Sequence, residues 1–476
     1  MSRREHPSPR NRVGRLARWV DDRVGVARAA RGTLQKVFPN HWSFLLGEIA
    51  LYSFVVLVIT GVFLTFFFKA STEPVVYEGS YAPLRGVEVS QAYKSTLDLS
   101  FDVRAGLVMR QMHHWAALVF VAAIVVHLAR VFFTGAFRRP RELNWVIGIT
   151  LLLLGILNGF AGYSLPDDQL SGTGVRIAYS VLLSVPFIGP WAASLLFGGG
   201  FPGEDIIPRL FAIHILIVPV IITGLLTLHL GLLVRHKHTH FPGKGAREDN
   251  VVGERLWPTY AFKAGGLFFL VGAVLAALGG LAQINPVWMW GPYQPQNVSS
   301  ASQPDWYMGW LEGALRLMPN WEWRGWGYQI PNPFWAAVLL PGVTFTLLYL
   351  WPWIEARVTK DRREHHVLDR PRDRPVRTAL GAATLSFYTV LGFAGSNDVL
   401  AIAFDLSLNA VLVAFRVLLF VVPPVVGVVT YRVCKELQRR DGPVEVEASG
   451  RSGPGSGRAA AGRLAPGDPA HAGPVP

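Results

Sequence analysis

Four histidines lie inside two strongly apolar segments, in two pairs with nearly equal spacing. His113 and His127 form the first pair, and His214 and His229, which are one position further apart, form the second. At a helical rise of about 1.5 Å per residue, each pair spans about 21 Å along its axis. With about 100° of rotation per residue, the second ring returns close to the face of the first. Each helix would therefore present two imidazoles on one face, one near each membrane surface.

Two helices of this kind, packed face to face, would form two bis-histidine sites stacked across a bilayer. A polar ring inside hydrocarbon is costly unless it has a partner, and imidazole is a common metal ligand. We interpret the occupant as haem, for which histidine is an ordinary axial ligand. The single cysteine, Cys434, and the lack of a Cys-x-x-Cys-His motif indicate that both haems are bound non-covalently. For any one histidine, the alternatives are a hydrogen bond between helices or a proton relay.

The choice between the adjacent histidines His113 and His114 follows from rotation. From His114 to His127 a helix turns by about 220° beyond its complete turns, which places those two rings on opposite faces. We therefore expect His113 to be the ligand.

Three arginines lie close in sequence to these histidines: Arg110, Arg130 and Arg209. A guanidinium group near the membrane edge suits the carboxylate of a haem propionate. The alternative is that these side chains extend to lipid head groups.

Glycines repeat at the same period in the neighbouring apolar segments. Gly47 and Gly61 have the same separation as His113 and His127, and so do Gly148 and Gly162. A flat macrocycle between helices needs backbone without side chains where its edge meets a helix. Packing of small residues between membrane helices is the ordinary alternative for any one glycine.

The composition favours a membrane protein. The chain is 51% hydrophobic and 16% charged, whereas soluble domains carry about 25% charged residues. Eight apolar stretches are long enough to cross about 30 Å of hydrocarbon. They are residues 43–68, 109–134, 145–165, 210–234, 260–282, 334–354, 379–395 and 410–431. We predict an all-α integral membrane protein with eight transmembrane helices, the first four forming a bundle around the two haems. The apolar segment 175–197 contains two prolines and is interpreted as a pair of short interfacial helices.

The net charge of +13 is distributed by loop rather than gathered on one surface. The two terminal segments and the connections 135–144, 235–259 and 356–378 hold 33 Lys and Arg residues, whereas the alternate connections hold seven. This asymmetry follows the positive-inside rule, so both termini of a multi-pass plasma-membrane protein are expected in the cytoplasm. Nucleic-acid binding is not expected, because it would require a basic face with interleaved aromatic residues.

The chain divides into four parts by composition. We predict a basic cytoplasmic segment (1–41), a dihaem four-helix bundle (42–240), a C-terminal membrane domain with an outer quinol-site loop and four further helices (241–435), and a disordered cytoplasmic tail (436–476).

The motifs in the order found here resemble those of cytochrome b, the haem-bearing membrane subunit of the cytochrome bc quinol oxidoreductases. The resemblance runs from about Trp42 to Arg432. The motifs that carry it, besides the glycine pairs, are Arg110-x-x-His113…His127-x-x-Arg130, Gly162-Tyr163-x-Leu165-Pro166, Arg209…His214…His229 and Pro304-Asp305-Trp306-Tyr307. Residues 165–174 and the aspartate at 305 are similar to the actinobacterial branch.

This resemblance implies a role for each histidine pair. His113 and His214 would hold a low-potential haem near the outer surface, and His127 and His229 a high-potential haem near the cytoplasm. Quinol would be oxidised in an outer pocket formed by residues 163–175 and 284–310. Its expected lining residues include Tyr163, Gly174 and Pro304.

Asp305 and Tyr307 are the expected catalytic residues of the outer site. A quinol releases two protons as its electrons leave, and a nearby carboxylate can accept one of them. The alternative for Asp305 is a cap on the helix that begins at Trp306. Asp167 and Asp168 are interpreted as exposed loop carboxylates, with assistance in proton exit as the alternative.

The inner quinone site is less completely specified. A histidine and an acidic residue expected from mitochondrial relatives are replaced here by Val234 and Ala264, and only Lys263 is assigned to this site. Such departures favour a different quinone, which we take to be menaquinone.

The function implied is proton-translocating quinol–cytochrome c reduction. The implied partners are a Rieske iron–sulfur subunit, a dihaem cytochrome c subunit, a cytochrome c oxidase in a supercomplex, membrane lipid and a second copy of the complex. Because the chain has one cysteine, an iron–sulfur cluster would come from another subunit. The alternatives are a stand-alone dihaem electron conduit, such as a dehydrogenase anchor, and a transporter with a histidine proton relay, which would bind no pigment.

Overall fold

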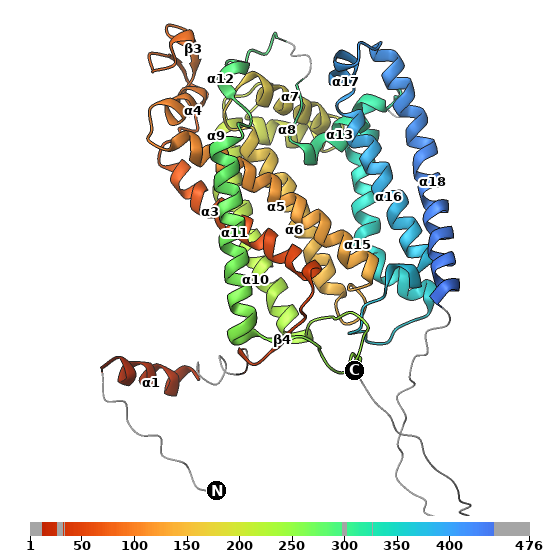
Figure 1. Ribbon diagram of the computed structural model, residues 1–476. Coiled ribbons are helices and arrows are strands. Elements are labelled where there is room, and N and C mark those ends of the chain that lie inside the picture. Colours follow the sequence, from red (N-terminus) through yellow and green to blue (C-terminus); the bar gives the residue numbers. More distant parts are fainter. Residues whose placement is uncertain (1–11, 26–31, 33, 298–301, 326, 442–476) are drawn as a thin grey trace, which may run out of the picture.

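The computed structural model describes residues 12–25, 32, 34–297, 302–325 and 327–441, and long helices dominate it (Figure 1). In these residues seven helical segments are long and apolar enough to cross a membrane. They are Trp42–Thr65 (containing α3, Leu45–Thr65), Gly106–Thr134 (α5), Glu142–Tyr163 (α6), Ile206–His236 (α9, η3 and α10), Leu256–Leu281 (η4 and α11), Asn332–Thr359 (α14, η5 and α15) and Leu408–Arg440 (α18, Leu408–Asp441). In hydrocarbon only a helix satisfies every backbone polar group within its own segment, which explains these long unbroken elements.

The eighth predicted span is α16 (Pro375–Ala394), which continues into α17 (Asn397–Ala403) after a bend of 61°. These two helices meet the span criteria only when they are taken together. The count of seven to eight candidate membrane helices therefore agrees with the predicted fold class. Many large apolar side chains on these helices are exposed, including Ile59, Phe269 and Phe420, as expected of surfaces that face lipid.

The apolar segment 175–197 does not form a span of its own. It folds as two short helices, α7 (Gln169–Leu183) and α8 (Gly189–Phe197), which confirms the predicted helix pair. Other short helices are α1 (Arg12–Val24), α4 (Gln91–Phe101), α12 (Val287–Trp290) and α13 (Trp306–Leu317). Three two-stranded antiparallel ribbons complete the fold: β1 (Val37–Phe38) with β4 (Glu254–Arg255), β2 (Pro74–Val76) with β3 (Glu88–Ser90), and β5 (Trp323–Gly325) with β6 (Tyr328–Ile330).

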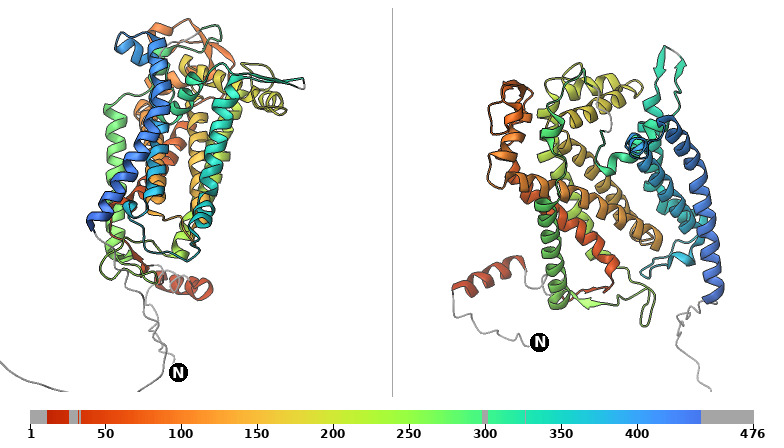
Figure 2. Two further views of the ribbon diagram at one scale, coloured as in Figure 1. Left: turned by 90° about the vertical axis from the view of Figure 1, so that its right-hand side faces the viewer. Right: turned by 45° about the horizontal axis from the view of Figure 1, so that its top comes forward.

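The helices form two neighbouring groups (Figures 1 and 2). In the first group, α3, α5, α6 and α10 (Val218–His236) share one apolar core that includes Phe54, Phe120, Leu151 and Ile222. In the second group, α16 packs against α18 and α13. The helix α11 (Ala261–Leu281) packs against α3 and α5, so it adjoins the first group although it follows α10 in sequence.

The basic connections meet at one end of the molecule, which we call the basic end (residues 135–144, 235–259 and 356–378). Arg141 joins all three: its guanidinium donates to the carbonyls of His365 (2.6 Å), His236 (3.0 Å) and Lys237 (3.0 Å). The alternate connections meet at the opposite end, where Tyr93 Oη donates to the carbonyl of Val287. The predicted segregation of the two sets of loops is therefore present in the structure.

The contacts of Arg141 predict a stability effect. Arg141→Gln would leave three partly buried carbonyl groups without this donor, so we expect a loss of about 2 kcal/mol. Arg139→Gln is the matched control, because Arg139 is exposed and makes one long hydrogen bond, to the carbonyl of Arg362 (3.4 Å). Thermal unfolding of the two purified variants in detergent measures the difference. Equal midpoints would show that Arg141 does not hold the basic end together.

Candidate functional site

The four histidines come from two facing helical segments of the first group. His113 and His127 lie on α5, His214 lies in η3 (Ile213–Ile217), and His229 lies on α10 (Val218–His236). The rings of His113 and His214 have centroids 6.0 Å apart and are nearly perpendicular, at 77°. The structure thus brings one member of each sequence pair together.

The element η3 is a π-helical turn, which accommodates one residue more than an α-helical turn. It ends two residues before Pro219, whose missing N–H cannot complete the α-helical bond to the carbonyl of Ile215. The widened turn explains why His214 and His229 are one position further apart than His113 and His127. Because the extra residue is absorbed, both histidines of the segment face the same side of the bundle.

Each of the four repeated glycines faces one of the four histidines. A Cβ atom placed on each glycine would contact or overlap the Cε1 atom of an imidazole. The pairs are Gly47 with His127 (3.2 Å), Gly61 with His113 (3.3 Å), Gly148 with His229 (3.8 Å) and Gly162 with His214, which would overlap outright. The glycines therefore clear the space in which the imidazole rings lie.

The outer histidine rings are oriented by a second set of contacts that the sequence did not identify. His214 Nδ1 donates to the carbonyl of Asn158 at 2.9 Å. His113 Nδ1 lies 2.9 Å from Thr60 Oγ1, whose own proton is donated to the carbonyl of Val56 at 2.7 Å. Thr60 must therefore accept from His113. Both rings then carry their proton on Nδ1 and leave the Nε2 lone pair free to ligate a metal.

A haem fits this donor set better than a bare metal ion does. Among the described residues, no group of three or more His, Cys, Asp and Glu side chains could hold an ion. A porphyrin supplies four nitrogen ligands of its own and requires only axial ligands from the protein. Two histidine pairs at two depths are therefore suited to two haems.

Two of the three arginines form no ion pair with a carboxylate among the described residues. Arg110 donates to the carbonyl of Asn285 (2.9 Å), and Arg130 lies 4.0 Å from the ring centroid of Phe44. Within the part of the chain that the structure describes, neither forms an ion pair, and buried guanidinium nitrogens of both have no hydrogen-bond acceptor. Burying an unpaired cation is unfavourable. A bound anion, such as a haem propionate, would satisfy these groups.

Arg209 has a different environment from the other two arginines. Its guanidinium forms an ion pair with Asp205 at 2.7 Å and also donates to the carbonyl of Leu195. Its side chain is 39% exposed. Only Arg110 and Arg130 therefore show the unmet charge that a propionate would balance.

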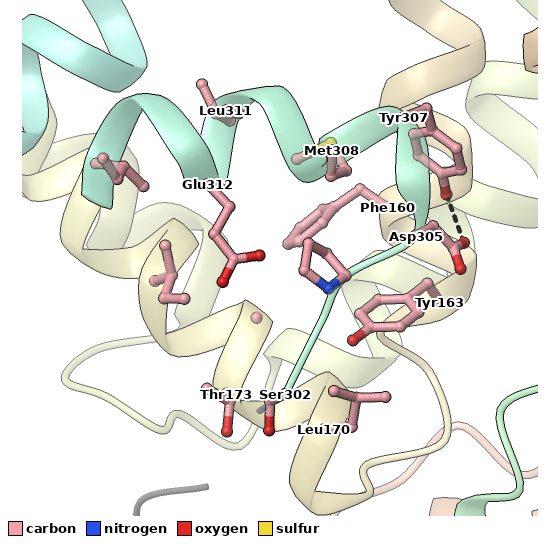
Figure 3. A pocket seen from close by; sticks show the side chains of 14 residues that line it. Phe160, Tyr163, Leu170, Thr173, Ser302, Asp305, Tyr307, Met308, Leu311 and Glu312 are labelled. Atoms are coloured by element: carbon pink, nitrogen blue, oxygen red, sulfur yellow. Dashed lines mark hydrogen bonds between the residues drawn. The ribbon is translucent and has the colours of Figure 1, made fainter. Parts of the chain in front are cut away.

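A pocket at the end opposite the basic end collects the residues predicted for the outer quinol site (Figure 3). Tyr163 comes from the end of α6 and Gly174 from α7, whereas Pro304 and Asp305 directly precede α13 and Tyr307 lies in its first turn. The remaining walls are mainly apolar. They are formed by Phe160, Leu170, Thr173, Ile177, Ser302, Met308, Leu311, Glu312 and Leu315.

Asp305 is held by two side chains and does not cap α13 with its own. His114 Nε2 donates to Oδ1 at 2.8 Å, and Tyr307 Oη donates to Oδ2 at 3.0 Å. The rotation that excludes His114 as a partner of His127 points it toward α13 instead. Sequence reasoning missed this contact. A signal was present, because two adjacent histidines on a helix point in different directions, so His114 had to contact a different neighbour from His113.

The neighbouring aspartates are not exposed loop carboxylates, so that interpretation was wrong. Asp168 is fully buried and caps α7, with its side chain accepting from the backbone N–H of Leu170 at 3.3 Å. Burial raises the pKa of Asp167 and of Asp168 to about 6. Asp168 lies in the short turn between the end of α6 and α7, and α7 forms one wall of the pocket. The carboxylate that caps α7 is therefore enclosed by these two helices.

The inner site has fewer converging groups in the structure. Lys263 Nζ pairs with Glu254 at 2.8 Å, approaches Asn40 Oδ1 at 3.3 Å, and its side chain is 48% exposed. A second carboxylate at this level, Glu48, accepts from Tyr260. Sequence reasoning missed Glu48 because it was read only as part of an apolar span.

A multi-span helical membrane protein with two facing histidine pairs and a lateral apolar pocket defines the cytochrome b class, and comparisons with known proteins agree. Residues 118–292 match the family described as cytochrome b (N-terminal)/b6. The chain is 56% identical over 430 residues to the cytochrome bc1 complex cytochrome b subunit of Mycobacterium tuberculosis, covering 90% of this chain and 78% of that protein. It is 52% identical over 427 residues to the subunit of the same name from Streptomyces coelicolor, with the same coverage.

The chain therefore belongs to the cytochrome b subunits of cytochrome bc1 complexes, in their actinobacterial branch. A chain of a solved hyperthermophilic respiratory Complex III has the same fold, with a TM-score of 0.62 and 22% identity. That match covers 87% of this chain and all of the solved one. Membership of this family implies b-type haem.

The unequal glycine–histidine contacts predict unequal effects of adding one methyl group. Gly162→Ala would overlap the His214 ring and displace it, whereas Gly148→Ala would meet His229 at an ordinary 3.8 Å. We expect Gly162→Ala to lose or shift one b-haem absorption band and Gly148→Ala to retain both. Reduced-minus-oxidised spectra with haem counted per polypeptide provide the measurement. Identical spectra for the two variants would contradict the glycine assignment.

Proposed function

We propose that this subunit oxidises quinol in the pocket beside α13 and conducts electrons between two b-haem sites toward an inner quinone site. The family implies quinol–cytochrome c oxidoreductase activity in general terms. The proposal for this chain rests above all on the four glycine–histidine contacts, which arrange two histidine pairs at two depths of one bundle. The quinol is proposed to be menaquinol, and the reaction is coupled to proton translocation.

The proposed haem sites divide the residues by depth. His113 and His214 hold the low-potential haem, and His127 and His229 hold the high-potential haem. When bound, the two haems supply a path for single electrons. The protein orients the outer imidazoles through Thr60 and the carbonyl of Asn158, and Arg110 and Arg130 are proposed to bind propionates, with Arg209 as a further candidate.

At the outer site, the proposed catalytic residues are Asp305 and Tyr307. Apolar walls next to Tyr163, Gly174 and Pro304 exclude water from the ring of the quinol. Asp305 is proposed to accept a proton as a quinol O–H bond breaks. His114 and Tyr307 fix its orientation. Lys263 remains the proposed inner-site residue.

The arrangement in the membrane and the partners are also proposals. The basic end is proposed to face the cytoplasm together with both termini, since basic loops stay on that side. A Rieske subunit would take one electron at the outer pocket and pass it to a dihaem cytochrome c subunit. A second copy of the complex and a docked cytochrome c oxidase complete the expected assembly. The division at residues 240–241 separates the haem bundle from the domain that supplies α13.

Haem content tests the proposal directly. We expect the purified complex to contain two b-type haems per copy of this chain. His127→Leu should abolish the high-potential signal and spare much of the low-potential one, and His113→Leu should do the reverse, because each removes one axial ligand. Redox titration monitored by absorption resolves the two. A complex without b-type haem would overturn the proposal.

The role of Asp305 is tested by Asp305→Asn, which keeps the size of the side chain but cannot accept a proton. Quinol oxidation is expected to slow by about 100-fold. The haem spectrum should stay unchanged, because Asp305 touches neither histidine pair. Flash or stopped-flow reduction of the low-potential haem gives the rate. A rate within twofold of the parent protein would remove Asp305 from the mechanism.

A further inference from the structure

The short helix α1 (Arg12–Val24) belongs to neither of the two helix groups. It lies beside the basic end and runs across the direction of the long helices (Figures 1 and 2). Its large apolar side chains are exposed, Val13 by 76%, Leu16 by 63% and Trp19 by 54%. Most of the stability of a short helix comes from packing of its apolar face. The described part of the chain leaves this face uncovered, so the partner of α1 lies outside it.

The sequence of α1 places apolar and charged residues on opposite faces. With about 100° of rotation per residue, Val13, Leu16 and Val20 lie within about 60° of one another. Arg15 and Asp22 lie on the other side of the helix, at least about 120° from the centre of that apolar face. This strong separation is typical of helices that lie in the plane of a membrane surface.

Trp19 and Arg23 form the boundary between the two faces. The guanidinium carbon of Arg23 lies 4.0 Å from the ring centroid of Trp19, and its Nη1 donates to the carbonyl of Trp19 at 3.1 Å. Tryptophan is enriched where hydrocarbon meets lipid head groups. Arginine can keep its stem in apolar surroundings while its charge reaches the aqueous side. The pair therefore suits the boundary between acyl chains and phosphate groups.

The charge of the N-terminal segment favours an anionic surface as the partner. Residues 1–41 contain ten Lys and Arg but three Asp and Glu, and α1 itself contributes four arginines and two aspartates. Anionic lipid attracts basic amphipathic helices. An apolar groove on another subunit would need the aliphatic face but not the excess of positive charge. Charge complementarity therefore favours a lipid surface over a protein groove.

The chain that follows α1 is fixed at the level where two membrane spans begin. The strand β1 (Val37–Phe38) pairs with β4 (Glu254–Arg255), and the spans that follow these strands begin at Trp42 and Leu256. Trp42 is itself exposed, as expected of an aromatic residue at the membrane boundary. The β1–β4 ribbon thus holds the chain at the membrane surface, with α1 tethered next to it.

We propose that α1 is an interfacial anchor that binds an anionic lipid surface on the side of the basic end. Val13, Leu16 and Val20 insert between the acyl chains, Trp19 lies at the level of the head groups, and the arginines contact lipid phosphates. This inference goes beyond the proposed function and does not depend on the haem or quinol chemistry. It takes from that proposal only the side of the membrane that the basic end faces.

The test uses the intact complex in lipid nanodiscs, with Cys434→Ser as the parent because Cys434 is the only cysteine of this chain. A spin label is attached to Val20→Cys or, as the matched control, to Asp22→Cys on the opposite face. The complex with Cys434→Ser alone gives the background from thiols of other subunits. Electron paramagnetic resonance measures how accessible each label is to oxygen, which concentrates in hydrocarbon, and to a water-soluble nickel chelate.

The ratio of oxygen to nickel accessibility reports the position of each label. In phosphatidylglycerol nanodiscs, we expect this ratio to be about fivefold higher for the Val20 label than for the Asp22 label. In phosphatidylcholine nanodiscs the difference should fall by about half or more, because the arginines lose their anionic partners. Leu16→Asp added to Val20→Cys should abolish the difference, because it places a charge in the apolar face.

Two outcomes for the Val20 label would overturn the inference. Nickel accessibility equal to that of the Asp22 label would show a helix surrounded by water, and low accessibility to both reagents would show a protein partner. An equal ratio in the two lipids would overturn the requirement for anionic lipid. The b-haem content and the rate of quinol oxidation should stay at the parent level in every variant. Loss of the anchor is therefore distinguishable from failure of the proposed function.

Discussion

Four imidazole rings lie against four glycines inside a bundle of membrane helices, and the positions of the surrounding helices follow from these contacts. A ring can approach the backbone of a neighbouring helix this closely only where the backbone carries no Cβ. The contacts join α3 to α5 at two depths, and α6 to the η3–α10 segment at the same two depths. The glycine period and the histidine period must then agree. The π-helical turn at Ile213–Ile217 restores that agreement where the sequence has one residue too many.

Charge is balanced differently in the interior and at the two ends. At the basic end, Arg377 pairs with both Glu355 and Asp369 at 2.7 Å, and Arg141 is saturated by carbonyl oxygens. Arg110 and Arg130 have no such carboxylates among the described residues, although each lies one helical turn from a histidine of the proposed haem sites. Because unpaired buried cations are unfavourable, these two arginines favour the binding of an anionic group inside the bundle.

Much of the fold could be predicted from the sequence because its signals are local. Helical periodicity alone paired Gly47 with Gly61 and placed His113 and His127 on one face, and hydropathy located the spans. The missing information is long-range. Asp305 is 191 residues from His114, so no periodicity reports their hydrogen bond. The burial of Asp168 likewise depends on residues that follow α11, since its backbone pairs with Pro292. The bend after α16 was invisible to a hydropathy window, which registers apolar length and not direction.

The outer pocket joins these local and long-range features. Its floor is the end of α6, which the glycine contacts position through Gly162, and its other wall is α13, which comes after α11 and α12 in the chain. Two carboxylates at α13 are hydrogen-bonded to different extents. Asp305 is held in place by hydrogen bonds to both of its oxygens, whereas Glu312 has one oxygen, Oε2, without a hydrogen-bond partner among the described residues. The pocket therefore combines one carboxylate whose two oxygens are both held with one that keeps an unused oxygen, and both face the same apolar lining.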